Sequence, residues 1–290
     1  MTETEPILTY RPLLFAIAYR MLASVADAED AVQETFLRWH RALADGVVVE
    51  SPKAWLSAVI TRLCIDQLRS ARVQREQYLG PWLPEPLATR EEPDVADTAL
   101  LNESLSTAFL LLLETLSPKE RAVFLLHDVF AYGYAEIAAI VGESETYCRQ
   151  LARRARDHLA ARRPRFPVSP ADQEHLTRRF IDATVTGDLS ALVATLASDV
   201  TLWSDGGPNA RAARRPIHGA DKVARFLLGI SRHVPPGTVI GVELVNGWPA
   251  IVARLDGHPI TVVSLESTAG VIHGVYIVSN PDKFHGVPPA

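Results

Sequence analysis

The N-terminal part of the chain repeats apolar residues every three or four positions, which is the spacing of an amphipathic helix. Leu14, Ala18 and Leu22 form one such row, and another runs through residues 28–43. A third helix is expected from Pro52, because proline suits a first helical turn. Its apolar row is Trp55, Val59, Leu63 and Leu68. The pattern predicts an all-α domain over residues 6–76.

The helical pattern stops at residue 77 and resumes at Ala99. Pro81, Pro84, Pro86 and Pro93 interrupt any regular element between these points. The stretch is also rich in acidic residues. We therefore expect a linker over residues 77–98 and a second all-α domain over residues 99–163.

From Ser169 the pattern changes to one or two helices within residues 171–197, followed by strand-like runs. The last four runs are separated by Asn246-Gly247, Asp256-Gly257 and Ala269-Gly270, dipeptides that turn antiparallel hairpins. An α+β domain is therefore predicted over residues 169–290. Its strand-like runs are Val200–Trp203, Thr238–Val245, Ala250–Leu255, Ile260–Glu266 and Val271–Val278.

The second all-α domain contains a helix-turn-helix pattern. A helix capped at Ser117 is expected to reach Val129, and a short helix is expected over Tyr134–Val141. Gly142 provides a tight turn, and a longer helix then opens at Ser144. This order of short helix, glycine turn and longer helix is typical of a DNA-reading domain.

The longer helix has an apolar side and a basic side. Arg149 is expected to pair with guanine and Gln150 with adenine, while later arginines contact phosphates. The plainer interpretation is a solvated basic face on an ordinary helix. The expected DNA-binding residues are Thr146, Arg149, Gln150, Arg153 and Arg154.

The first domain carries an acidic helix start and then a basic helix. Acidic residues at a helix start also stabilise its dipole, so Asp27, Glu29, Asp30 and Glu34 alone do not prove a binding surface. Together the two clusters predict an acidic face for a protein partner and a basic helix for nucleic acid. The basic helix carries Lys53, Arg62, Arg69, Arg72 and Arg75 against Asp66.

Composition adds little to this picture. The net charge is -5, which by itself does not indicate a nucleic-acid partner. Cys64 and Cys148 lie far apart, so neither a metal site nor a disulfide framework is expected, and a reducing cytoplasm fits. No apolar stretch approaches the roughly 20 residues of a membrane span. We expect no cofactor and no membrane association.

Several segments resemble the extracytoplasmic-function (ECF) sigma factors. Residues 27–36 resemble their polymerase-binding region, residues 55–56 and 65–69 their −10 helix, and residues 116–121 and 134–138 their −35-reading domain. The resemblance implies that core RNA polymerase and promoter DNA are the partners. It assigns polymerase binding to Asp27, Glu29, Asp30, Gln33 and Glu34, and −10 binding to Arg62, Asp66, Arg69 and Arg72. The family usually has Asn where this chain has Arg62.

The remainder resembles a SigJ-like subgroup that carries a fused SnoaL-like cone domain. Residues 82–86 resemble its linker motif, residues 141–144 and 148–151 its recognition helix, and residues 280–284 its tail motif. The loop Asp205-Gly206-Gly207 keeps only part of a motif that usually ends in Gly-Lys, here replaced by Pro208 and Asn209. The resemblance implies that the fused domain regulates the chain in place of a separate anti-sigma protein. The residues implicated are Trp82, Leu83, Pro84, Asp205, Gly206, Gly207, Asn280, Pro281, Asp282 and Lys283.

Two expectations concern how these motifs meet. Trp82 is expected to dock near Asp205-Gly206-Gly207. Asp282 and Lys283 are expected to make partly exposed charged contacts with the basic first domain or with the acidic linker. Two other functions remain open. One is a polymerase-independent helix-turn-helix regulator gated by a small ligand. The other is a SnoaL-like enzyme whose pocket would use Asp205, His218, His273 or Tyr276 beside Trp203.

Overall fold

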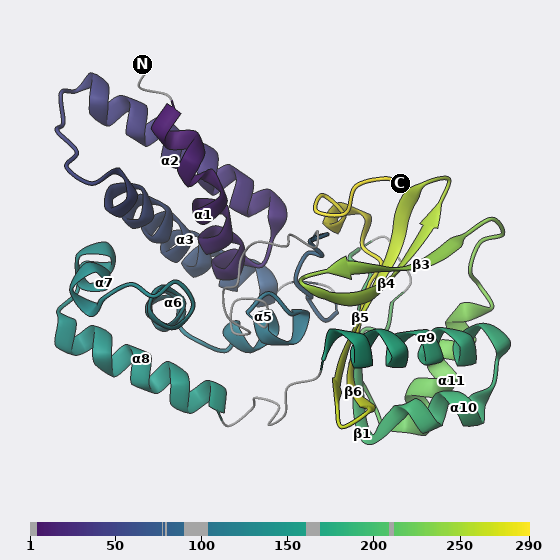
Figure 1. The fold of residues 1–290 in the computed structure, drawn as a ribbon. Helices are drawn as coiled ribbons and strands as arrows, with labels where there is room; N and C mark the ends of the chain where they lie inside the picture. Colours follow the sequence, from purple (N-terminus) through teal and green to yellow (C-terminus); the bar gives the residue numbers. More distant parts are fainter. Residues whose placement is uncertain (1–4, 77, 79, 90–103, 161–168, 209–211) are drawn as a thin grey trace. The chain divides into compact units, whose positions relative to one another are not determined.

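The structure, a computed structural model, describes residues 5–76, 78, 80–89, 104–160, 169–208 and 212–290 (Figure 1). The expected linker residues 90–98, the expected helix start at Ala99, residues 161–168 and Asn209 lie outside them, as does the side chain of Arg72. None of the helices in the described part is long and apolar enough to cross a membrane.

The chain forms two units, and each consists of two separate stretches of sequence. The first combines Met1–Glu76 with Leu110–Arg163, and the second combines Gln77–Phe109 with Pro164–Ala290. The short helix α5 (Thr107–Leu113) therefore spans a boundary between the units. The expected linker thus belongs to the second unit, as do residues 104–109, which were expected to lie in the second all-α domain.

Three long helices begin the first unit, as the apolar spacing predicts. Ser24 starts the second of them by accepting a hydrogen bond from the backbone N–H of Asp27 at 3.2 Å. In the third helix the fully buried row is Leu56, Ile60 and Cys64. The predicted row through Val59 and Leu63 is only half-buried, because the helix is rotated by about one residue. The helices are α1 (Glu5–Leu22), α2 (Val25–Ala44) and α3 (Pro52–Glu76).

The helix-turn-helix follows in the same unit. Ser117 and Glu120 form the predicted capping box. The expected single helix to Val129 is divided, since its last five residues form a π-helical turn. Gly142 ends the next helix with a φ of 70°, a left-handed conformation that favours glycine. The elements are α6 (Pro118–Phe124), η1 (Leu125–Val129), α7 (Tyr134–Val141) and α8 (Glu145–Ala160).

The second unit contains a six-stranded sheet in the order β2-β1-β6-β5-β4-β3. All three predicted hairpin dipeptides lie at turns, and both residues of each pair have a positive φ. The sequence did not predict β2 or α11, and β1 is longer than expected. The elements are α9 (Pro170–Thr186), α10 (Leu189–Thr195), β1 (Leu196–Asp205), β2 (Ile217–His218), α11 (Ala220–Ser231), β3 (Val239–Val245), β4 (Trp248–Leu255), β5 (His258–Thr268), β6 (Val271–Val278) and η2 (Pro281–Lys283).

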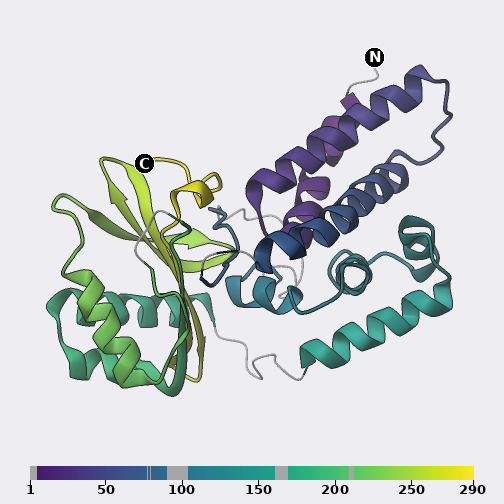
Figure 2. The same ribbon diagram turned by 180° about the vertical axis from the view of Figure 1, so that it is seen from behind.

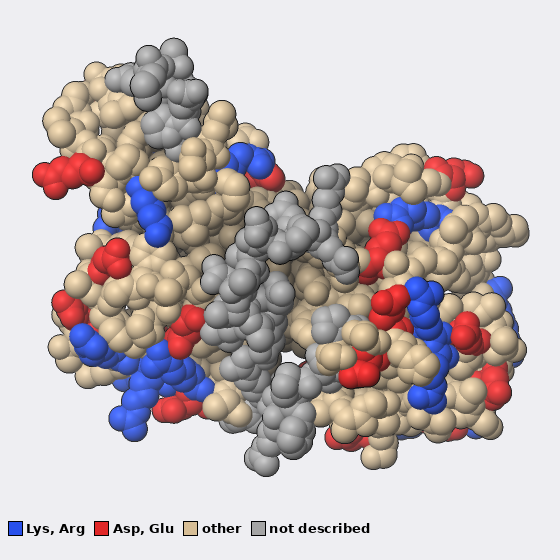
Figure 3. All heavy atoms as spheres, viewed as in Figure 1, with Lys and Arg blue, Asp and Glu red and all other residues tan. Residues whose placement is uncertain are grey.

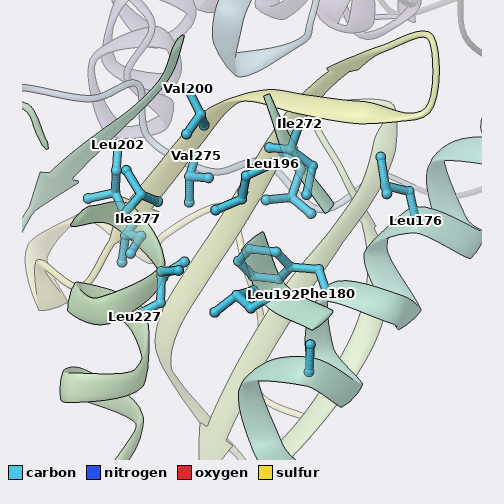
Figure 4. Packing of buried hydrophobic residues seen from close by; sticks show 14 of the residues in the cluster. Leu176, Phe180, Leu192, Leu196, Val200, Leu202, Leu227, Ile272, Val275 and Ile277 are labelled. Atoms are coloured by element: carbon cyan, nitrogen blue, oxygen red, sulfur yellow. The ribbon is translucent and has the colours of Figure 1, made fainter. Parts of the chain in front are cut away.

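The two faces of this sheet have different coverings. Helices α9, α10 and α11 lie together on one face in both views (Figures 1 and 2). Their apolar side chains pack with Val200, Leu202, Val275 and Ile277 into the main core (Figure 4). A smaller core on the other face contains Val245, Ala250, Val252, Val262 and Val287. The C-terminal tail therefore forms part of the folded unit.

Candidate polymerase and promoter interface

The recognition helix α8 presents all the predicted DNA-binding side chains to solvent. Cys148, Leu151 and Ala155 are buried on its inner side. The surface of α8 is one of the places where basic side chains gather in Figure 3. The exposed residues are Thr146, Arg149, Gln150, Arg153 and Arg154. The expected division between an apolar and a basic side is therefore present.

Two neighbours fix the position of Arg149. Its guanidinium carbon lies 4.5 Å from the ring centroid of Tyr134, which is a cation–π distance. Its Nη2 donates to Glu145 Oε2 at 3.2 Å. The ring of Tyr134 in turn lies 4.1 Å from that of His127. The arginine is thus oriented before any DNA is present.

Arg156 is a further basic residue on α8 that the sequence analysis did not select. Its Nε donates to Asp128 Oδ1 at 2.9 Å. Hydrogen bonding to Asp128 raises the pKa of Arg156, and Tyr134 adds a smaller contribution. Arg153 forms a longer pair with Asp157, at 3.8 Å between highly exposed side chains. Arg153 is therefore freer to contact DNA than Arg156.

The predicted polymerase-binding residues lie along the first half of α2. Asp30 and Gln33 are exposed. Glu29 accepts a hydrogen bond from Arg11 at 2.5 Å, and Glu34 accepts one from Arg38 at 2.8 Å. The bond from Arg38 lowers the pKa of Glu34. Two of the acidic side chains of this cluster, Glu29 and Glu34, are therefore paired with arginines, whereas Asp30 is exposed.

The predicted −10 residues on α3 have different surroundings. Asp66 and Arg69 form an exposed pair on the same helix, at 3.3 Å. Arg62 instead bonds two carbonyl oxygens of α7: its Nε donates to Ile140 and its Nη2 to Ala139, both at 2.8 Å. Only the helical position of Arg72 is described.

In the second unit, one buried carboxylate joins the linker to the sheet. Asp205, at the end of β1, is 1% exposed. It accepts hydrogen bonds from the Tyr78 hydroxyl at 2.6 Å and from the backbone N–H of Leu83 at 2.9 Å. It also accepts one from the Lys283 ammonium at 2.7 Å. The linker, the Asp205-Gly206-Gly207 loop and the tail thus meet at one carboxylate.

Lys283 is buried here, which corrects the expectation of a partly exposed charged contact. Its ammonium donates to the carbonyl oxygen of Leu83 at 2.5 Å as well as to Asp205. It lies 4.2 Å from the ring centroid of Trp82 and 5.2 Å from that of Tyr78. The linker aromatics therefore enclose the cation.

Burial, reinforced by the bond to Asp205, raises the pKa of Tyr78 above its ordinary value. Its hydroxyl therefore stays protonated and continues to donate to Asp205. Asn280 Nδ2 donates back to the same hydroxyl at 3.0 Å. A Cβ on Gly207 would lie 2.6 Å from the Asn280 side chain, so this loop position requires glycine. Leu83, Pro84 and Gly206 are buried, whereas Pro281 and Asp282 are exposed.

The rest of the described linker pairs with the edge of the sheet. The N–H of Thr89 donates to Leu244 at 2.9 Å, and the N–H of Asn246 donates to Leu87 at 2.7 Å. Nearby, Glu85 is 3% exposed and accepts from His285 Nδ1 at 2.8 Å. The linker is therefore held at several points between Tyr78 and Thr89.

The candidate enzymatic residues do not line the helix-covered core. Trp203 and Tyr276 are paired across β1 and β6 and stack at 5.0 Å. Because side chains alternate along a strand, they face away from neighbouring Leu202 and Val275 of that core. His218 and His273 are exposed. In the described part of the chain, no group of three or more His, Cys, Asp or Glu residues is placed to hold a metal ion.

Two family models match the helical parts of the chain. Residues 7–73 match sigma-70 region 2, and residues 106–159 match sigma-70 region 4. Over 301 aligned residues the chain is 39% identical to the ECF RNA polymerase sigma factor SigJ of Mycobacterium tuberculosis, covering 99% of this chain and 94% of that protein. The chain belongs to the ECF RNA polymerase sigma factors.

One further relative and one solved structure agree with this assignment. The sigma factor is 34% identical over 287 residues to the probable ECF RNA polymerase sigma factor SigI of Mycobacterium tuberculosis, covering 97% of this chain and 96% of that protein. Its fold matches the crystal structure of Mycobacterium tuberculosis SigJ with a TM-score of 0.77 and 35% identity, covering 99% of this chain and all of that one. The predicted order of two helical sigma domains and an α+β domain is confirmed.

Membership of this family decides between the functions that the sequence left open. The protein is a transcription initiation factor that works with core RNA polymerase at promoters, rather than an enzyme or a polymerase-independent regulator. The residues that bind each partner remain predictions.

Proposed function

We propose that the acidic half of α2 binds core RNA polymerase, α3 contacts the −10 element and α8 reads the −35 element. The exposed side chains of Asp30 and Gln33 support the first role. The exposed Arg149, supported by Tyr134, favours readout of a guanine in the −35 element. We place the protein in the cytoplasm, where its polymerase partner works.

We further propose that the C-terminal domain controls this activity through the linker between regions 2 and 4. The observation that carries the proposal is the bonding of Tyr78 and Leu83 to Asp205 and Lys283. The separation of regions 2 and 4 depends on the path of the chain that connects them. A domain that binds this connection is therefore suited to regulate the factor without a separate anti-sigma protein.

Transcription with purified core RNA polymerase tests both levels of the proposal. The full chain should direct initiation from promoters that carry its own −35 and −10 elements, and mutation of either element should abolish the product. Lys283→Met should then change the output by altering the linker, although it lies in neither proposed promoter-binding region. If this substitution leaves promoter-specific transcription unchanged, control through the linker is contradicted, but the roles of α2, α3 and α8 are not. Absence of promoter-specific transcription by the folded chain would contradict the assigned roles.

Truncation of the C-terminal tail tests whether the docked linker restrains regions 2 and 4. Removing residues 280–290 should raise promoter-dependent transcription if the docked linker restrains regions 2 and 4. Because Val287 belongs to the smaller core, the truncated chain needs a folding check by circular dichroism. A loss of output with the fold preserved would show instead that the tail supports the active arrangement.

A further inference from the structure

An aromatic pair lies on the face of the sheet that helices α9, α10 and α11 do not cover. The strand register aligns one row across β1, β6, β5 and β4, formed by Trp203, Tyr276, Ser264 and Ala250. Ala250 belongs to the smaller core, so the row lies on the face opposite the helices. The rings of Trp203 and Tyr276 stack with 5.0 Å between their centroids and 11° between their planes. Trp203 and Ser264 are only half-buried, so solvent reaches part of this row.

A carboxylate lies beside the aromatic pair. The Tyr276 hydroxyl donates to Glu266 Oε2 at 2.6 Å. A Cβ on Gly274 would lie 2.8 Å from both oxygens of this hydrogen bond, so a glycine is required for the two side chains to meet over β6. Burial, reinforced by Glu266, raises the pKa of Tyr276, and the hydroxyl therefore remains a donor. This arrangement holds Glu266 next to the rings.

Glu266 differs from the other acidic side chains of this face in its charge balance. Asp205 pairs with Lys283, and Glu243 pairs with Arg254. Among the described residues, no basic side chain pairs with Glu266, which is half-buried. The neighbouring hydroxyl satisfies one carboxylate oxygen but brings no positive charge. Because a partly buried charge is unfavourable without a counter-charge, a cation bound here would be stabilised.

We propose that Trp203, Tyr276 and Glu266 form a binding site for a small organic ammonium ion with a flat apolar body. The flat body stacks on the open part of the Trp203 ring, and the electron-rich ring face also attracts the cation. The ammonium group donates to Glu266 Oε1, which has no partner among the described residues. A neutral ligand would gain the stacking without the charge, and an inorganic cation would gain the charge without the stacking.

The site lies next to the carboxylate that holds the linker. Trp203 and Asp205 are two positions apart on β1, so they lie on the same face with their Cα atoms about 7 Å apart. Asp205 accepts the backbone N–H of Leu83. A ligand on Trp203 therefore alters the surroundings of the linker bonds. This effect rests on the linker control proposed above, whereas binding itself does not.

Calorimetric titration of the full chain with two matched probes tests the site. Phenethylammonium carries a flat ring and a positive charge, and phenethyl alcohol has nearly the same shape without the charge. The parent chain should bind phenethylammonium about fivefold more tightly or better, because only this probe gains the cation contacts. Equal affinity for the two probes, or no binding of either by the folded chain, would overturn the inference.

Substitutions then test the two contacts separately. Glu266→Gln can still accept from Tyr276 but lacks the charge. It should lower the affinity for phenethylammonium about fivefold or more and leave the affinity for phenethyl alcohol unchanged. Trp203→Leu should weaken binding of both probes. Glu174→Gln on α9 is the matched control, since it neutralises an exposed glutamate and should change neither affinity. Thermal unfolding checks the fold of each variant, and equal affinity of the parent and Glu266→Gln for phenethylammonium would refute the role of Glu266.

A third probe separates a free ligand from a lysine side chain of another protein. Acetyl-lysine amide carries an ammonium group on a flexible chain and has no flat body. It should bind more weakly than phenethylammonium. Equal or tighter binding of acetyl-lysine amide would assign the site to a protein partner and overturn the small-ligand inference.

Transcription tests the effect on the linker. Saturating phenethylammonium should change promoter-dependent output from the parent holoenzyme but not from the Glu266→Gln holoenzyme. Unchanged parental output, with binding confirmed by calorimetry, would overturn the effect on the linker. Failure of the parent holoenzyme to start transcription without the probe would instead count against the proposed function.

Discussion

The Lys283 ammonium lies 2.7 Å from a carboxylate oxygen of Asp205, and both residues are buried. Removing one member of such a pair leaves an uncompensated charge away from water. Asp205→Ala should therefore lower the free energy of unfolding of the C-terminal unit by about 3–5 kcal/mol. Lys283→Met should lower the free energy of unfolding by a smaller amount, because Asp205 keeps the hydrogen bonds from Tyr78, Leu83 and Gly207.

Urea unfolding followed by tryptophan fluorescence measures both changes. Asp221→Ala is the control, since it removes an exposed i,i+4 pair with Arg225 on α11 and should give no measurable change. Equal stability of Asp205→Ala and Asp221→Ala would contradict the assigned importance of the buried pair.

Charge reversal on α2 should weaken binding to core RNA polymerase. Asp30→Lys with Glu34→Lys replaces two acids of the proposed contact face, so like charges would meet and the dissociation constant should rise about tenfold or more. Glu174→Lys with Asp182→Lys on α9 makes the same change in net charge. Glu174 is a suitable match because, like Glu34, it pairs with an arginine four residues later. Equal co-purification of both double variants with core polymerase would remove the polymerase-binding role from α2.

Substitution of Arg149 should relax sequence preference at one position of the −35 element. Arg149→Ala should cost about 1–3 kcal/mol of discrimination there. Tyr134→Ala should relax the same position, because the ring supports the guanidinium, whereas Tyr134→Phe keeps the ring and should keep the preference. Holoenzyme transcription from a library of randomised −35 elements reads out both effects. A uniform fall in transcription from all −35 sequences would indicate that Arg149 contacts only the DNA backbone.

Arg154 should behave differently, as a phosphate contact. Arg154→Ala should weaken binding to all DNA sequences by the same factor. It should also reduce the slope of log affinity against log salt concentration by about 1. Fluorescence anisotropy of promoter fragments at several salt concentrations measures this slope. Retention of the parental slope would exclude the proposed phosphate contact.

The helix-turn-helix could be predicted from sequence because local signals mark its main boundaries. Ser117 caps α6, and Gly142 takes the left-handed conformation that ends α7. Such effects depend on residues within a few positions of one another. The π-helical turn after Phe124 has no comparable local signal and was missed.

Helix α11 was missed for a related reason. It carries buried Val223 and Leu227 at helical spacing, yet Gly219 before it gives no side-chain cap. The partners of Arg62 and Asp205 depend on tertiary structure. Arg62 bonds residues 77 and 78 positions away, and Asp205 bonds a residue 122 positions away. Motifs could select both residues and could bring the linker near Asp205, but they could not identify the groups that bond to either side chain.

During translation, the linker is synthesised before the residues of the C-terminal domain that bind it. Leu83 leaves the ribosome 122 residues before Asp205 and 200 residues before Lys283. At translation rates of about 5–20 residues per second, the nascent chain waits about 6–25 s for the first partner and about 10–40 s for the second. Regions 2 and 4 are both complete before either partner exists. A newly made molecule therefore passes through a stage in which the proposed control by its C-terminal domain cannot yet operate.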